Sequence, residues 1–305
     1  MNLAERLGYD VDAKLLLVNG DDYGLCNAVN SAVQSLLEQE AISSATIMMP
    51  CGWAPQAALW SAQHPQYDVG IHLTFTSEWD HYKWGPVTTT GSTDSLVTPM
   101  GYFPKTCEAF ETDATEAQVR IEIVSQIERA LQLGMKPTHA DNHMGSLYGL
   151  ATGRTFLPLV LEICATYGLP FRMPRYVLEQ DGQIAGIEHA EQAAQIAEVA
   201  DKLGVIIPDY LIGLPFHKQV GETYDSWKQQ LMQVLRYLHS GVSELIIHPA
   251  YDTEELQAFH FEPEKRSWEY HIFLDEEVQQ TLKQQNIHLI RWRQLQQLQQ
   301  GNSSK

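Results

Sequence analysis

Short apolar runs alternate with amphipathic stretches along most of this 305-residue chain. The first run, Leu15–Val18, contains no polar residue and predicts a buried strand. The strand after Glu244 has no alternating polar residues before its histidine, which is typical of a strand that is buried on both faces. Runs of this kind, bounded by polar or turn-forming residues, predict strands. The predicted strands are Lys14–Asn19, Ser44–Met49, Asp68–Thr74, Pro137–Asn142, Leu169–Met173, Tyr210–Gly213, Glu244–His248 and Ile287–Arg291.

The stretches between these runs predict helices. The longest, Ala114–Leu133, carries an apolar stripe with charged residues between its members, and Gly134 followed by Pro137 ends it. This alternation of strands and helices implies an α/β fold with a parallel sheet, closed or open. The other predicted helices are Ala28–Glu38, Ala54–Gln63, Thr155–Tyr167, Ala190–Leu203, Tyr224–Ser240 and Glu276–Gln285.

The segment Trp79–Thr106 interrupts the alternation. It is rich in Gly, Thr, Trp and Tyr and shows little periodicity. Irregular segments of this length are usually functional or disordered. We interpret it as an insertion over the C-terminal mouth of the fold that shapes the substrate cleft and is more mobile than the rest. No internal repeat and no Pro/Ser linker divides the chain, so we expect residues 1–305 to form one domain.

Composition narrows the class of protein. The chain is 44% hydrophobic and 19% charged, which is ordinary for a soluble globular protein. It has no apolar run long enough to span a membrane and no apolar segment of a signal peptide, so we expect a cytoplasmic protein. The four cysteines form no Cys-x-x-Cys pair and are expected to be reduced. The formal charge of −18 argues against nucleic acids and anionic membranes as partners.

Ligand-type residues stand at the ends of several predicted strands. Charge is costly at the end of a buried strand unless it is paired or coordinated. Neighbours on an extended chain point to opposite sides, so one carboxylate of an Asp pair can face a metal while the other faces substrate or water. Strand ends that converge on one mouth are typical of an enzyme. The strand-end residues are Asp21, Asp22, His72, His139, Asp141, His143 and His248.

Structural interpretations compete with these functional ones. Asp21 and Asp22 can form a turn that caps the following helix, and His72 can be a hydrogen-bonded core histidine. His139 shares a strand face with Asp141 and His143. We expect it to contact either the metal ligands or the substrate, in preference to binding the metal itself. Asp141 is expected to orient a ligand imidazole.

Three further residues are candidates for supporting roles. Arg172, which lies between apolar neighbours, is expected to point inward and to pair with a carboxylate such as Asp21, or else to be a surface charge. Trp79 and Trp84 can stack on the apolar faces of a sugar, or they can simply pack the insertion down.

Four motifs occur in a fixed order: Asn-x-Asp-Asp-Tyr-Gly at 19–24, Gly-Ile-His-Leu-Thr at 70–74, Pro-Thr-His-x-Asp-x-His at 137–143 and His-Pro-Ala at 248–250. Together they resemble the YdjC-type carbohydrate deacetylases, the ChbG/HpnK family, over about residues 14 to 291. We therefore expect a single-domain α/β fold, an irregular (β/α) barrel of seven or eight strands. The resemblance also implies that Asp22, His72 and His143 bind metal and that Asp21 is the general base.

The activity expected from this resemblance is metal-dependent hydrolysis of the N-acetyl group of an acetamido sugar or chito-oligosaccharide. One divalent metal ion would activate a water molecule and polarise the carbonyl group. Asp21 would take the water proton, and His248 would protonate the departing amine. Mg²⁺ prefers oxygen ligands, whereas two imidazoles favour Zn²⁺ or another transition metal, so the sequence does not distinguish magnesium from zinc.

Two other functions stay open at this point. A metal-dependent sugar phosphoesterase or isomerase uses similar ligands, although the chain has no Gly-rich phosphate loop. A non-catalytic carbohydrate-binding protein would need neither Asp21 nor His248, and their presence favours the enzyme. The expected partner is an acetylated amino-sugar substrate, with no nucleic acid and no membrane, and the sequence leaves a homodimer open.

Overall fold

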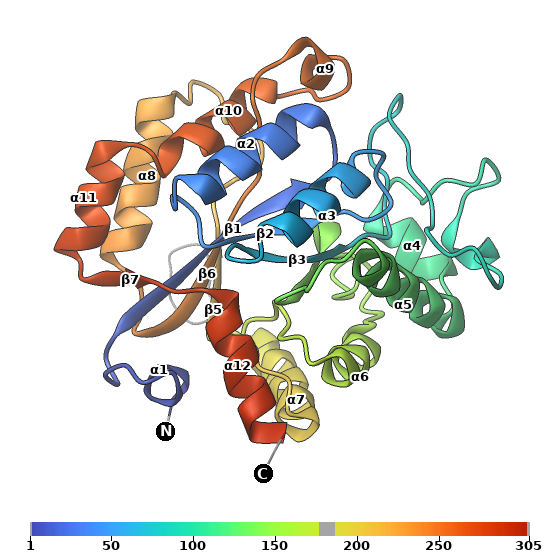
Figure 1. The fold of residues 1–305 in the computed structure, drawn as a ribbon, viewed down its shortest axis with the longest axis horizontal. Coiled ribbons are helices and arrows are strands. Elements are labelled where there is room, and N and C mark those ends of the chain that lie inside the picture. Colours follow the sequence, from blue (N-terminus) through green and yellow to red (C-terminus); the bar gives the residue numbers. More distant parts are fainter. Residues whose placement is uncertain (1, 177–186, 304–305) are drawn as a thin grey trace.

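A parallel sheet of seven strands lies at the centre of the computed structural model, with helices packed around it (Figure 1). The structure describes residues 2–176 and 187–303. The strand order is β4-β3-β2-β1-β6-β5, and β7 pairs with the first part of β1. The strands are β1 (Lys14–Tyr23), β2 (Ser44–Ile47), β3 (Asp68–Leu73), β4 (Ala140–Asn142), β5 (Tyr210–Gly213), β6 (Gly241–Ile247) and β7 (Ile287–Leu289).

The sheet curls toward a barrel because extended chain beyond β4 continues its hydrogen bonding. Phe171 forms an isolated parallel bridge with Ala140 of β4. On the other side, the Phe171 amide donates to the Ile206 carbonyl, and the Asp209 amide donates to the carbonyl of Val242 in β6. The expected irregular, barrel-like α/β fold is therefore confirmed, with seven strands in the described part of the chain.

Helices follow strands as a (β/α) fold requires. α2 (Asn27–Glu38) lies against β1, α3 (Ala54–Gln63) against β2 and α5 (Glu116–Gln132) against β3, so each covers the strand before it. Both chain termini lie at one end of the molecule (Figure 1). Within the described residues, no helix has the length and apolar character needed to cross a membrane. The remaining helices are α1 (Leu3–Arg6), α4 (Cys107–Asp113), α6 (Leu157–Tyr167), α7 (Ile187–Leu203), α8 (Tyr224–Arg236), α9 (Glu254–Gln257), α10 (Pro263–Ile272), α11 (Glu276–Gln284) and α12 (Trp292–Ser303), with 3₁₀ turns η1 (Asp94–Leu96) and η2 (His143–Gly145).

β1 is buried along its apolar run, as that run predicts, and β6, which carries Glu244, is almost entirely buried as well. Leu15 to Val18 are all fully buried. Leu16 and Val18 belong to the main hydrophobic core, whereas Leu15 and Leu17 pack in a smaller cluster with Trp292 of α12. Since β1 also pairs with β2, β6 and β7, it is the strand around which the fold is organised.

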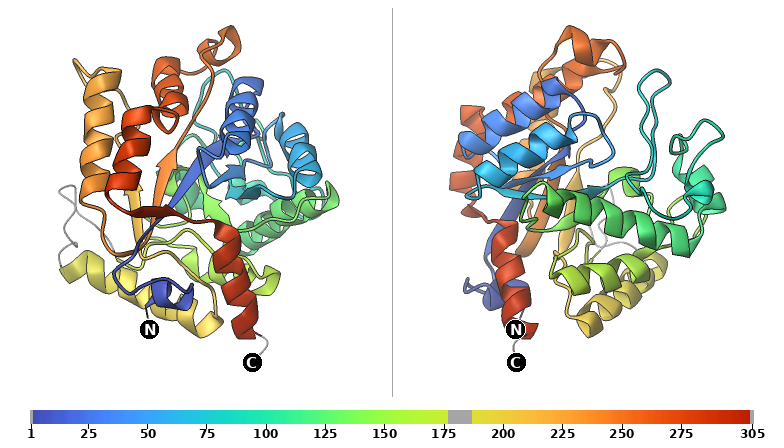
Figure 2. Two further views of the ribbon diagram at one scale, coloured as in Figure 1. Left: turned by 60° about the vertical axis from the view of Figure 1, so that its left-hand side comes forward. Right: turned by 45° about the vertical axis from the view of Figure 1, so that its right-hand side comes forward.

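The insertion Trp79–Thr106 extends past α4 and α5 and is drawn in cyan in Figure 2. The Glu122 carboxylate of α5 accepts hydrogen bonds from the amides of Val87 and Thr88. At the start of the insertion, the Trp84 indole donates to the Thr76 carbonyl. The insertion is therefore tied to the body of the fold at both the β3 end and α5.

Several elements differ from the predictions, and three of them are informative. Leu169–Met173 is not a strand apart from its single bridge, since Pro170 cannot donate a ladder hydrogen bond. The predicted helix Ala114–Leu133 begins later, because α4 ends at Asp113 and Thr115 occupies the N-cap position of a separate α5 that starts at Glu116. α10 was not predicted, although the proline in its first turn is a helix-start signal.

Candidate functional site

A β-bulge at the end of β1 turns two adjacent carboxylates to the same side. The register with β2 shifts between Gly20 and Tyr23, and Asp22 adopts a left-handed backbone with φ of 61°. As a result, His72 Nε2 lies 3.8 Å from Asp21 Oδ2 and 3.4 Å from Asp22 Oδ1. The expectation that the two carboxylates point to opposite sides is wrong, because alternation holds only for a regular strand.

Asp22, His72 and His143 bring three ligand atoms together. Asp22 Oδ1 lies 3.4 Å from His72 Nε2 and 3.2 Å from His143 Nδ1, and the two ring nitrogens are 3.3 Å apart. All three residues are buried. They come from the ends of β1, β3 and β4, which are brought together by the parallel sheet.

A carboxylate behind each imidazole determines which nitrogen faces this triangle. Asp141 Oδ1 lies 2.6 Å from His72 Nδ1, and Glu78 Oε2 lies 3.0 Å from His143 Nε2. In the neutral rings, the other nitrogens therefore present lone pairs to the centre. Burial alone would lower both imidazole pKa values. The nearby carboxylates outweigh this effect of burial. Asp141 contributes most to raising the pKa of His72 to about 10, and Glu78 contributes most to raising the pKa of His143 to about 9.

The triangle fits a divalent cation. Asp22 Oδ1 is buried and accepts no hydrogen bond from any described residue. Tetrahedral ligands at about 2.0–2.1 Å from one ion lie about 3.3 Å from each other, which matches the 3.2–3.4 Å edges. Arg266 Nη2 donates to the other oxygen, Asp22 Oδ2, at 2.6 Å. Asp22 therefore offers one oxygen to a cation, and the arrangement suits three protein ligands with further positions open.

Arg172 lies behind the triangle and holds Asp21. Its Nη1 and Nη2 donate to the two Asp21 carboxylate oxygens, each at 2.7 Å, and Nη2 also lies 2.8 Å from Asp141 Oδ2. Burial alone would raise the pKa of Asp21, but Arg172 and His72 outweigh it and hold the pKa well below its usual value. Asp21, His72 and Asp141 also approach one another closely. This second group is the poorer cation site, because the guanidinium already neutralises its carboxylates.

Glu244 of β6 adds a third carboxylate beside the same guanidinium. Its Oε1 lies 2.9 Å from Arg172 Nη2, a nitrogen whose two hydrogens are shared with Asp21 and Asp141. Neither Glu244 oxygen accepts a hydrogen bond from the residues that the structure describes. Burial raises the pKa of Glu244 to about 7, although Arg172 acts in the opposite direction. A proton on Glu244 therefore relieves the crowding of negative charge around Arg172.

Helix α10 supplies two charged side chains, one turn apart, to the same site. Arg266 contacts Asp22, as described above, and Glu269 Oε2 lies 3.6 Å from His248 Nδ1 and accepts a hydrogen bond from the His248 amide. His248 directly follows β6, and its charge is one of those that lower the pKa of Asp21. Neither Arg266 nor Glu269 was predicted from the sequence, where the only signal was a short amphipathic stretch behind a proline.

His139 lies in the core, beside the triangle rather than within it. Its ring stacks on Trp292 with centroids 4.5 Å apart, and a Cβ on Gly70 would come within 2.6 Å of the His139 carbonyl oxygen. His139 Nε2 lies 3.3 Å from Asn19 Oδ1, and the Asn19 amide donates to Asp21 Oδ1. Burial holds the pKa of His139 well below its usual value, so the ring is neutral. Among the described residues, Asn19 is therefore the link between His139 and Asp21.

Trp79 and Trp84 lie in the wall of the site. They are 6% and 4% exposed, and their ring centroids are 5.5 Å apart. Trp84 lies 6.2 Å from the His143 ring, and the Arg266 guanidinium carbon lies 6.0 Å from the centre of Trp79. So little of either ring is exposed that the structure favours packing over stacking on a sugar. The neighbouring Glu78 was missed by the sequence interpretation, although it closely follows the His72 motif.

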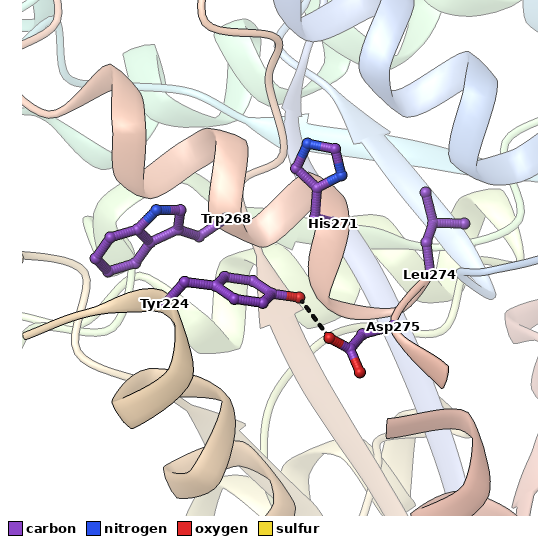
Figure 3. Close-up of a pocket in the computed structure, with 5 residues that line it drawn as sticks. All are labelled: Tyr224, Trp268, His271, Leu274 and Asp275. Atoms are coloured by element: carbon purple, nitrogen blue, oxygen red, sulfur yellow. Dashed lines mark hydrogen bonds between the residues drawn. The ribbon is translucent and has the colours of Figure 1, made fainter. Parts of the chain in front are cut away.

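A separate surface pocket lies between α8, α10 and α11 (Figure 3). The Tyr224 hydroxyl donates to Asp275 Oδ2 at 3.1 Å, and Lys228 pairs with the same oxygen. The pocket contains none of the site residues predicted from the sequence, and its carboxylate is already occupied. The residues that line it are Tyr224, Trp268, His271, Leu274 and Asp275.

Comparisons with known proteins agree on one family. A model of YdjC-like proteins matches residues 15–284. A carbohydrate deacetylase of Thermoanaerobacter pseudethanolicus is 29% identical over 276 residues, which cover 90% of this chain and 97% of the relative. A chitooligosaccharide deacetylase of Serratia marcescens is 34% identical over 53% of this chain and 60% of its own. The crystal structure of an Enterococcus faecalis protein described as a cellobiose-phosphate cleavage protein is 23% identical, with a TM-score of 0.73 over 93% of this chain and 99% of that one, and shows the shared fold.

Loss of either imidazole should abolish metal binding at the triangle. His72→Ala and His143→Ala each remove one of three ligands. Loss of a hydrogen-bond partner behind a ligand lowers metal affinity by about 10–100-fold, and loss of the ligand itself should lower the metal affinity further. Elemental analysis of reconstituted, dialysed protein measures the effect, and His64→Ala at the end of α3 is a control that should keep the metal. Full metal occupancy in both site variants would contradict the assignment.

Metal affinity should rise with pH between about 6 and 9. The metal-free protein holds protons on His72 and His143 up to pKa values of about 10 and about 9. Since only a neutral imidazole binds a cation, binding must release these protons, and each one makes affinity rise about tenfold per pH unit. Calorimetric titrations in buffers of different ionisation enthalpy measure the release. Affinity that does not change with pH would place the ligands elsewhere.

Proposed function

This chain belongs to the YdjC-like protein family, and we propose that it hydrolyses the N-acetyl group of an acetamido sugar or chito-oligosaccharide, releasing acetate. Curated relatives that match nearly its whole length are carbohydrate deacetylases. The observation that carries the proposal is the buried triangle of Asp22, His72 and His143 with a second carboxylate, Asp21, beside it. Amide hydrolysis needs such a combination of charge stabilisation and a nearby proton acceptor.

The triangle would hold one divalent cation, which, when bound, polarises the acetamide carbonyl and makes a water molecule more acidic. The protein supplies the geometry. Arg266 occupies Asp22 Oδ2 and thereby directs the remaining oxygen into the triangle. Asp141 and Glu78 hold the two imidazoles with one nitrogen pointing inward.

Asp21 is the proposed general base. It is ionised at any working pH, because Arg172 binds both its oxygens and its pKa is held well below the usual value. Asn19 fixes Oδ1, whereas Oδ2 lies on the side of His72. Oδ2 is therefore the oxygen placed to take a proton from the attacking water. The guanidinium makes Asp21 a weaker base but fixes its position and charge.

His248 is the proposed general acid. A sugar amine is a poor leaving group until its nitrogen receives a proton. Glu269 lies on the Nδ1 side of the His248 ring and also binds the His248 amide. This leaves Nε2 as the nitrogen that can donate to the substrate, and Pro249 limits the movement of the backbone at that point.

Acetate release from acetylated chito-oligosaccharides by metal-reconstituted protein tests the function directly. A panel of acetamido sugars, run with magnesium, zinc and other divalent ions, identifies both substrate and metal. Sugar binding without acetate release under all of these conditions would instead indicate a carbohydrate-binding protein.

Asp21→Asn should lower kcat by about 100-fold or more while the protein keeps its metal. The amide has nearly the same shape but cannot take the water proton. Asp141→Asn is the informative comparison, because Asp141 orients His72 and its loss should weaken metal binding instead. Steady-state kinetics and elemental analysis of the two variants separate the roles. Unchanged turnover in Asp21→Asn would show that another group is the base.

His248→Ala should impair acetamide hydrolysis far more than hydrolysis of an activated aryl acetate, whose leaving group departs without a proton. It should also flatten the alkaline limb of the pH profile of kcat, which reports a group that must stay protonated. Metal content should not change, and exposed His271→Ala serves as the control. Equal losses on both substrates would assign His248 a positioning role.

A further inference from the structure

Phe216 presents an exposed apolar surface beside the site, which the two tryptophans do not. Phe216 is 58% exposed, whereas Trp79 and Trp84 are almost completely buried. Its ring packs edge to face on His248, with centroids 4.9 Å apart and an interplanar angle of 74°. An exposed aromatic ring that touches the proposed acid is a surface on which a bound substrate can rest.

The sheet and a set of ion pairs determine where Phe216 lies. Gly213 at the end of β5 is in register with Ile246 of β6, so the chain that leaves β5 emerges next to the chain that carries His248. The segment after Phe216 is then fastened to the start of α10. Glu262 accepts a hydrogen bond from the Lys218 amide at 3.1 Å and contacts the His217 ring at 3.0 Å.

A second contact strengthens this attachment. The Lys218 ammonium donates to Glu264 Oε2 at 2.7 Å and lies 4.8 Å from the centre of the Trp268 ring. The segment is thus held to α10 immediately beyond Phe216, while the Phe216 ring itself remains open to solvent. A ring that is already in position binds a ligand at a smaller cost in conformational entropy.

The neighbour of Phe216 indicates which part of the substrate it would contact. In the proposed reaction, His248 protonates the nitrogen that joins the acetyl group to the sugar. A group that packs against His248 therefore faces the sugar side of that bond, and the acetyl side lies toward the Asp22–His72–His143 triangle. The C–H face of a pyranose ring is apolar and flat enough to pack on a phenyl ring.

We propose that Phe216 is a substrate-positioning residue that packs against the pyranose ring carrying the acetamido group. This inference rests on the proposed function and adds to it the part of the site that selects for a sugar. It also gives the site an apolar surface for a sugar ring when the tryptophans of the insertion are buried. The ring contact holds the amide nitrogen near His248 and contributes mainly to binding.

Kinetics with two substrates tests this assignment. Phe216→Ala should lower kcat/KM for N,N′-diacetylchitobiose by about tenfold, as expected for loss of about 1.4 kcal/mol of apolar contact, mainly through KM. It should leave hydrolysis of trifluoroethyl acetate, an activated ester without any ring, unchanged. Phe216→Tyr should restore sugar turnover. Tyr237→Ala is the control, because it removes another exposed aromatic residue, which lies ahead of the start of β6 and so at the end of that strand opposite His248.

A binding measurement separates failure of this inference from failure of the proposed function. Calorimetric titration of diacetylchitobiose into Asp21→Asn protein, with and without Phe216→Ala, needs no turnover. Weaker binding in the double variant supports the contact even if the wild-type protein releases no acetate. Equal binding in both proteins would overturn it, because Phe216 would then act only through the orientation of His248. An equal loss of activity on sugar and on trifluoroethyl acetate would also overturn it, because Phe216 would then support the site as a whole and not the sugar ring.

Discussion

The candidate site depends on one buried positively charged side chain, the guanidinium of Arg172. The carboxylates of Asp21, Asp141 and Glu244 all lie within 2.9 Å of it, and none of them is more than 3% exposed. Removal of one partner from a buried ion pair leaves an uncompensated charge and costs about 3–5 kcal/mol. Because Asp141 also orients His72, the same guanidinium controls both the proposed base and one proposed metal ligand.

Helix α10 provides the second support. Its Arg266 contacts Asp22, and its Glu269 contacts His248. A buried ion pair, with 2.6 Å between the charged atoms of Lys265 and Glu222, anchors the helix. The site is therefore enclosed between the ends of parallel strands and one helix from late in the chain. Strand ends hold the side chains rigidly, and the helix completes their charge balance.

The proposed acid and base differ through their surroundings. Asp21 faces the Arg172 guanidinium, which keeps it ionised, whereas His248 lies beside the Glu269 carboxylate. Titratable groups with such opposed environments can divide the two proton transfers of a hydrolysis between them. The left-handed backbone at Asp22 costs about 1–3 kcal/mol, and the bulge that contains it is what brings Asp21 and Asp22 to the same imidazole.

The sequence by itself determined the α/β class, the strand that is buried on both faces and the motifs of the candidate site, because these depend on local periodicity and on residue type. Only the tertiary structure revealed the bulge at Asp22, since β1 is buried almost throughout and shows no alternation that an extra residue would disturb. Glu78, Glu244, Arg266 and Glu269 were missed for a related reason. A charged residue at the start of a strand, in irregular chain or in a short amphipathic helix looks like a solvent-exposed one until the fold places a partner against it. The burial of apolar residues in irregular segments was equally hidden in the sequence. Trp79 and Phe216 both lie in such segments, and only tertiary packing decided that the tryptophan is buried and the phenylalanine exposed.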